Sequence, residues 1–92
     1  MATYKVNRAK HATLSAATVD TVNLAYSGSV LRVRNRDSTD VLYFTIDGTV
    51  PTVAGDDTYF VGVGESLSIE QSIVKVVMLI SAGTPDVSVE LY

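Results

Sequence analysis

The sequence predicts an all-β fold: a single small antiparallel β-sandwich, Ig-like or jelly-roll-like, of seven or eight strands with an extended N-terminal arm. Val, Ile, Thr, Tyr and Phe make up 36 of the 92 residues, and these residue types fit the pleated, half-buried surface of a sheet. Short apolar or alternating segments recur at roughly 8–12-residue spacing between turn signals, as in small sandwiches. No segment shows the period of about 3.6 residues that is typical of an amphipathic helix.

Residues 1–11 are predicted to form an extended arm in front of a sandwich of residues 12–92. The arm segment shows neither the alternation of a strand nor the period of a helix. It carries Lys5, Arg8, Lys10 and His11 and no acidic side chain. The small residues of segment 12–17 are compatible either with a turn or with a continuing strand.

The first half of the sandwich is predicted to contain three strands, at residues 21–26, 30–35 and 41–46. In the second of them, Leu31 and Val33 alternate with Arg32 and Arg34, which is the pattern of a half-buried strand. The polar run 36–40 separates the second strand from the third. We therefore expect these two strands to pair as a hairpin with a five-residue loop.

The second half begins with a loop or an edge segment at residues 49–58, because Pro51 cannot donate a ladder hydrogen bond. The strands that follow are predicted at residues 59–63, 66–71, 73–82 and 87–92. Segment 73–82 is almost entirely apolar, which is typical of a central strand covered on both faces. No repeat or linker divides the chain, so a single domain is expected.

Composition excludes several classes of protein. The chain has no cysteine, so disulfides and thiolate metal sites are impossible. Its net charge of -3 argues against nucleic-acid binding through a basic face. The sequence contains no run of 18 apolar residues, so no membrane-spanning helix is expected. An apolar content of 47% is high for so small a chain and predicts surplus apolar surface, which favours a homo-oligomer or permanent docking.

Charge is segregated along the chain. Residues 1–36 carry a net charge of +5, and residues 37–92 carry -8. Complementary charged surfaces steer association and fix its register. We therefore expect the N-terminal arm to contact an acidic neighbour, either another copy or a different protein. The predicted contact residues are Tyr4, Lys5, Val6, Arg8 and Lys10.

No catalytic, cofactor or metal site is predicted. The only histidine, His11, falls in the arm, where a mobile base would be poorly placed beside a nucleophile. Asp47, Asp56 and Asp57 flank one loop and could attract calcium. Their spacing differs from that of the usual calcium-binding loop, and Asp-Gly and Gly-Asp pairs are ordinary turn chemistry.

One stretch resembles a known group of proteins. Residues 47–52 read Asp-Gly-Thr-Val-Pro-Thr and residues 54–59 read Ala-Gly-Asp-Asp-Thr-Tyr. Together with flanking segments over roughly residues 30–92, these strings resemble small virion proteins encoded among the structural genes of tailed bacteriophages. Residues 1–29 show no such resemblance.

The resemblance implies a non-enzymatic structural protein and supplies no active-site residues. Among virion roles, the expected one is a capsid decoration (cement) protein on the outer capsid surface. Its partner would be the major capsid protein, and a homo-oligomer is expected, with a trimer favoured. The alternatives are a head-fibre or minor tail component, or a carbohydrate-binding β-sandwich for host attachment.

Overall fold

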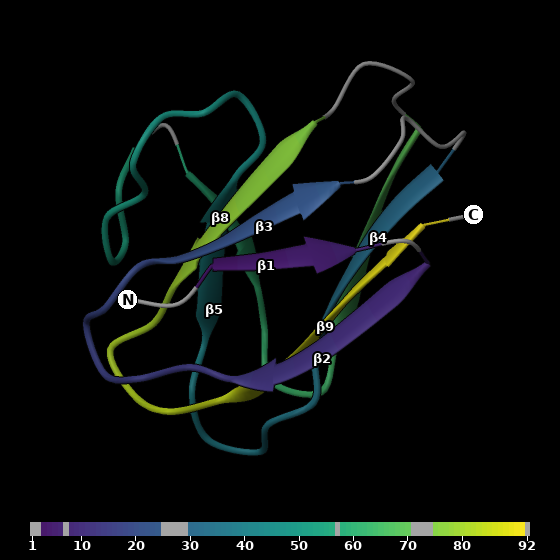
Figure 1. The fold of residues 1–92 in the computed structure, drawn as a ribbon. Coiled ribbons are helices and arrows are strands. Elements are labelled where there is room, and N and C mark those ends of the chain that lie inside the picture. The colour runs from purple at the N-terminus through teal and green to yellow at the C-terminus, as the bar shows by residue number, and fades with distance from the viewer. Residues whose placement is uncertain (1–2, 7, 25–29, 57, 71–74, 92) are drawn as a thin grey trace.

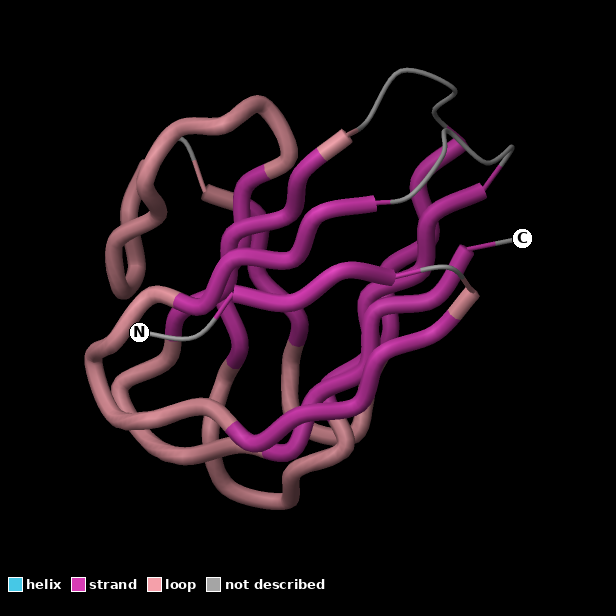
Figure 2. The backbone as a smooth tube through the Cα atoms, in the orientation of Figure 1, coloured by secondary structure: helices cyan, strands magenta, loops and turns pink. Residues whose placement is uncertain are grey.

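The computed structural model describes residues 3–6, 8–24, 30–56, 58–70 and 75–91. Within these residues the chain forms strands in two packed sheets and no helix, so the predicted all-β sandwich is confirmed (Figures 1 and 2). The strands are β1 (Thr3–Val6), β2 (Ala9–Thr13), β3 (Asp20–Leu24), β4 (Val30–Asn35), β5 (Leu42–Thr45), β6 (Tyr59–Val61), β7 (Ser66–Glu70), β8 (Val76–Ile80) and β9 (Asp86–Leu91).

The first sheet has the order β1-β3-β8-β5-β6, with β8 at its centre. This strand lies inside segment 73–82, so the predicted central strand is confirmed. Val77 and Leu79 are 0% and 1% exposed and face the core. Val76 and Met78 lie on the opposite face and are half-buried. The strand is therefore fully covered on its core face and only partly covered on the outer one.

The second sheet has the order β2-β9-β4-β7 and is antiparallel throughout. In β4, Leu31 and Val33 are buried in the core, whereas Arg32 and Arg34 face outward, as their alternation predicts. The two inner faces together form one apolar core. Phe44 is its largest fully buried side chain, and full burial of such a side chain contributes about 1.5–3 kcal/mol.

The N-terminal segment is extended, but it is part of the sandwich and not an arm in front of it. β1 pairs parallel with β3 in the first sheet, and β2 pairs antiparallel with β9 in the second. The expected boundary between residues 11 and 12 falls inside β2. Because the chain passes from one sheet to the other between Val6 and Ala9, no single alternation runs through residues 1–11.

The predicted hairpin between segments 30–35 and 41–46 is wrong. β4 pairs with β7 and β9 in the second sheet, while β5 pairs with β6 and β8 in the first. The buried Asn35 side chain holds the crossing between the sheets. Its Nδ2 donates to the carbonyls of Asp40 (2.7 Å) and Val61 (3.2 Å), and its Oδ1 accepts the N–H of Asp37 (3.0 Å).

Over the described residues, the remaining strand predictions agree with the structure to within a few residues; residues 71, 73–74 and 92 of the predicted strands lie outside that part of the chain. The predicted strand 21–26 corresponds to β3, and its last two residues lie outside the described part of the chain. Of segment 12–17, the first two residues complete β2, and a turn follows at Ala16 and Ala17. The segment thus contains both of the alternatives that its composition allows. The described residues of segment 49–58 form a loop, which is one of the two alternatives that Pro51 leaves open.

Candidate functional site

The predicted N-terminal contact residues lie at the edge of the sandwich where β1 meets β2. Lys5 and Arg8 are exposed. Tyr4 and Lys10 are half-buried, and the Lys10 ammonium lies 4.6 Å from the centre of the Tyr4 ring. Val6 is 1% exposed and belongs to the core, so its predicted partner contact is wrong. Of the five predicted contact residues, Lys5 and Arg8 are therefore the two that are exposed.

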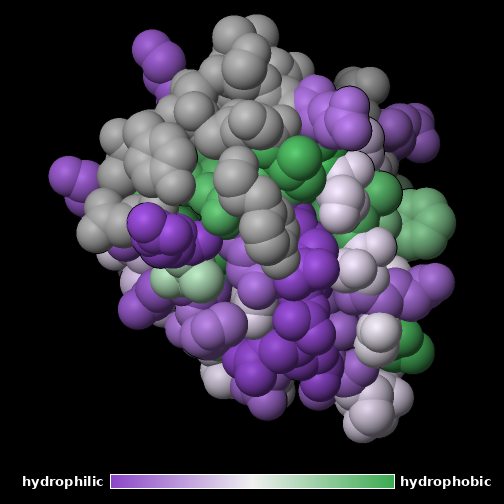
Figure 3. Space-filling view, turned by 90° about the vertical axis from the view of Figure 1, so that its right-hand side faces the viewer, coloured by the Kyte–Doolittle hydropathy of each residue, from purple (hydrophilic) through white to green (hydrophobic). Residues whose placement is uncertain are grey.

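The outer face of the second sheet is mainly hydrophilic (Figure 3). Arg32 Nε donates to Glu90 Oε1 at 2.9 Å, and an Arg34 nitrogen lies 3.8 Å from the same oxygen. His11 is held in β2, with Nδ1 2.6 Å from Ser88 Oγ. Because Ser88 is 0% exposed, its hydroxyl is closed to a substrate. This histidine–serine pair therefore connects neighbouring strands and offers no accessible nucleophile.

Exposed apolar side chains gather elsewhere, in a single segment. Among the described residues, the exposed large hydrophobic side chains all fall within residues 50–63. The exposed fractions are 64% for Val50, 39% for Val53, 46% for Tyr59, 67% for Phe60 and 44% for Val63. We call these five residues the apolar segment. Because exposed apolar patches are common at interaction surfaces, this segment is the candidate surface of the described chain.

The sheet order explains why β6 exposes aromatic rings. Tyr59 stacks on the buried Phe44 with ring centres 5.3 Å apart, so it faces the core side of the sheet at its open edge. Phe60 lies opposite Tyr43 and points to the other face. Because β6 is the last strand of the first sheet, no further strand flanks Phe60.

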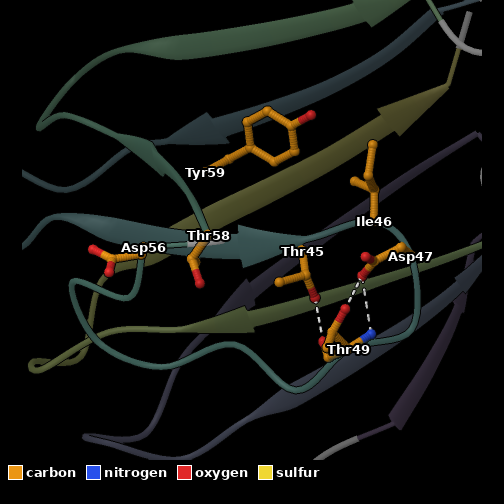
Figure 4. A pocket seen from close by; sticks show the side chains of 7 residues that line it. All are labelled: Thr45, Ile46, Asp47, Thr49, Asp56, Thr58 and Tyr59. Atoms are coloured by element: carbon orange, nitrogen blue, oxygen red, sulfur yellow. Dashed lines mark hydrogen bonds between the residues drawn. The ribbon is translucent and has the colours of Figure 1, made fainter.

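A pocket of about 720 Å³ opens beside the loop that precedes β6 (Figure 4). It is lined by Thr45, Ile46, Asp47, Thr49, Asp56, Thr58 and Tyr59. Figure 4 shows Ile46 and Tyr59 directed to one side of the strands and the hydroxyls of Thr45 and Thr49 to the other. A compact sugar-binding site would require an aromatic ring beside hydroxyl groups. The Tyr59 ring lies on the other side of the strands from these two hydroxyls, so it does not form such a site with them.

Asp47 shapes the start of this loop. Its Oδ1 accepts hydrogen bonds from the Thr49 hydroxyl and from the Thr49 N–H, the latter at 3.0 Å. These two hydrogen bonds hold the pKa of the Asp47 carboxyl below its usual value. Asp57 lies outside the described residues, and the part of the chain that is described holds no group of three metal-ligating side chains. Turn chemistry accounts for Asp47 without a calcium ion.

The lowered pKa predicts a pH-dependent contribution of Asp47 to stability. Asp47→Ala is expected to lower the urea midpoint at neutral pH. A carboxyl with a depressed folded-state pKa stabilises above its unfolded pKa of about 3.9, and this stabilisation is lost as pH falls through the folded value. The difference between wild type and Asp47→Ala should therefore shrink in acid.

The control for this prediction is Asp56→Ala, since the Asp56 carboxylate makes no hydrogen bond with another described residue. Its urea midpoint should stay close to that of wild type between neutral and acid pH. Equal pH profiles for the two variants would contradict a specific role for the Asp47 turn.

Sequence reasoning missed the apolar segment. The sequence predicts a strand at residues 59–63 but does not predict that its aromatic side chains are exposed. The signal that distinguishes it is context: the strand is very short, it follows a loop that contains Pro51, and Gly62 comes directly after it. Proline, short length and nearby turns are features of edge strands.

No protein-family model matches the chain, and no curated protein matches it significantly. In the described part of the chain, no helix is long and apolar enough to cross a membrane.

Proposed function

We propose that the chain is a non-enzymatic structural protein of a phage virion, and specifically a capsid decoration protein that binds the outer surface of the assembled head. The resemblance at residues 47–59 supports the virion class. The observation that carries the docking role is the apolar segment, which concentrates the most exposed large hydrophobic side chains on one part of a small domain.

The loop between β5 and β6 supports docking because local interactions hold its shape. Pro51 is buried and has a fixed φ. The Thr45 hydroxyl donates to the Thr49 carbonyl, and the Gly55 N–H donates to the Thr52 carbonyl at 3.1 Å. A loop with a preset conformation loses little entropy on binding. Val50, beside Pro51, can thus contact a partner with little loss of conformational entropy.

The proposed partner is the major capsid protein in its assembled lattice. A ligand that binds only the assembled state stabilises that state by mass action, and the effect grows with the ratio of free ligand to Kd. A protein that bridges neighbouring capsid subunits would stabilise the head in this way without any catalytic group.

Cosedimentation with purified, expanded phage heads that lack decoration protein tests the proposal. Wild-type protein should bind saturably, at a copy number that matches a lattice position. Val50→Ser combined with Val53→Ser should weaken binding roughly tenfold or more, because each buried valine contributes on the order of 1 kcal/mol more than serine. The control is Ser66→Ala with Ser68→Ala, two exposed positions on the outer face of the second sheet.

Absence of saturable binding to heads would overturn the decoration role and favour a head-fibre or minor tail component. Wild-type affinity in the double valine variant would show that the loop is not the docking surface.

Carbohydrate binding is the second candidate function, and the exposure of Tyr59 beside the pocket favours it. Tyr43 is half-buried, and Tyr92 lies outside the described residues. Because Tyr59 points away from the threonine hydroxyls, the decoration role is the first choice. A glycan-binding screen of wild type and Tyr59→Ala tests the second candidate, which predicts binding that the substitution abolishes.

A further inference from the structure

Part of the charge segregation of the sequence survives in space, at two opposite edges of the sandwich; Arg32 and Arg34 lie instead on β4, next to β7. β1 and β6 are the terminal strands of the first sheet, and β2 and β7 are those of the second. Lys5 lies on β1, Lys10 on β2 and Arg8 between them, and we call these residues the basic edge. The basic edge therefore runs from β1 in the first sheet to β2 in the second.

Acidic side chains lie on or beside the opposite terminal strands, β6 and β7. Asp56 precedes β6, Glu65 lies between β6 and β7, and Glu70 ends β7, and we call these residues the acidic edge. All three are exposed. The Glu65 carboxylate lies against Gly62, directly after β6. Asp56 and Glu65 thus flank the strand that carries Phe60, the most exposed large hydrophobic side chain described.

Neither edge is neutralised by another residue that the structure describes. The ion pairs among the described residues join Arg32 and Arg34 to Glu90, on the outer face of the second sheet. No residue of the basic or the acidic edge forms an ion pair with another described residue. One copy therefore presents two complementary charged edges. They lie at opposite ends of the strand order in each sheet, so they cannot contact each other within one copy.

We propose that the chain associates head to tail, the basic edge of one copy against the acidic edge of the next. Contact between two identical edges is disfavoured, because it would bring like charges together. In the opposed arrangement, Lys5 and Arg8 face acidic groups, and their alkyl stems can cover the Phe60 ring. Such a contact is heterologous, so it generates closed rings or open chains of copies.

This association goes beyond the proposed capsid role and uses a different part of the apolar segment. Capsid docking is argued from Val50 and Val53 in the loop, whereas self-association is argued from Phe60 on β6. The isolated protein suffices to test the association. If the protein self-associates but does not bind heads, only the capsid proposal is overturned. If it binds heads but stays monomeric in solution, only the head-to-tail contact is overturned.

Sedimentation velocity of the full chain over a range of concentrations, at low and high salt, tests the proposal. We expect association that weakens with salt. Lys5→Glu with Arg8→Glu, and separately Asp56→Lys with Glu65→Lys, should each weaken it about tenfold or more. An equimolar mixture of these two variants should associate again, because each then offers edges that complement the other. Phe60→Ser, which changes no charge, should also weaken the association of otherwise wild-type protein.

The matched control is Lys75→Glu, which reverses an exposed charge beside the central strand β8 and away from both edges. It should associate as wild type does, and unchanged melting temperatures should show that every variant is folded. A wild-type chain that stays monomeric at low salt would overturn the proposal. The proposal would also be overturned if the variant with Lys5→Glu and Arg8→Glu associated as strongly as wild type. An equal loss of association in Lys75→Glu would overturn it as well.

Discussion

Removal of residues 1–10 is expected to unfold the domain. The deletion takes away β1 and the first two residues of β2, and with them the parallel partner of β3. It also removes Val6 from the core and exposes Val22, which is 1% exposed in the intact chain. Losing the burial of several apolar side chains, at about 1.5–3 kcal/mol each, approaches the 5–15 kcal/mol that stabilises a typical domain.

Thermal unfolding followed by circular dichroism measures this effect. The truncated chain should show no cooperative transition. A pair of point variants separates core packing from strand loss: Val6→Ala should cost about 2 kcal/mol, and Lys5→Ala, at the exposed neighbouring position, less than about 0.5 kcal/mol. A truncated chain with a cooperative transition near the wild-type temperature would restore the interpretation of residues 1–11 as a separate arm.

The sequence predicts the fold class because strand periodicity is a local property. In β4, the alternation of Leu31 and Val33 with two arginines specifies both the strand and its inner face before any partner is known. The partner itself is not local. The polar run 36–40 after β4 would suit a hairpin loop, but in the structure the connection from β4 to β5 crosses between the sheets.

The interactions that fix this crossing join distant parts of the chain. Asn35 reaches the carbonyl of Val61, and the Ser81 hydroxyl donates to the carbonyl of Val41 at 2.7 Å. Buried polar groups of this kind must find partners. Nothing in the local pattern of residues 30–46 shows that those partners lie on the β6 and β8 sides of the molecule.

The sequence does not predict the exposed apolar segment because exposure, like strand pairing, depends on distant parts of the chain. Phe44 and Phe60 both lie in short apolar strands, yet one is 0% and the other 67% exposed. The difference depends on face and on sheet order: Phe44 points into the core from a strand flanked by two neighbours, and Phe60 points outward from the terminal strand. The charge segregation, in contrast, was visible in the sequence because it needs only a count of residues.

Leu79→Asp is expected to unfold the domain as completely as the truncation. Leu79 is 1% exposed at the centre of the first sheet, and its strand pairs with β3 and β5. The substitution removes a buried apolar side chain and places a carboxylate in the core. Together these changes cost at least about 5 kcal/mol, which is comparable with the whole stability of a small domain.

Val76→Asp is the matched control because it places the same side chain in the same strand. The sequence assigns both positions to the interior of a strand covered on two faces. In the structure Val76 is half-buried on the outer face, opposite the exposed Asn23, so water can solvate the new carboxylate. We expect Val76→Asp to stay folded with a loss of about 1 kcal/mol. If both variants unfold in equilibrium urea titrations, the outer face is covered and the sequence-based interpretation of this strand holds. If only Leu79→Asp unfolds, burial on the core face alone stabilises the centre of the sandwich.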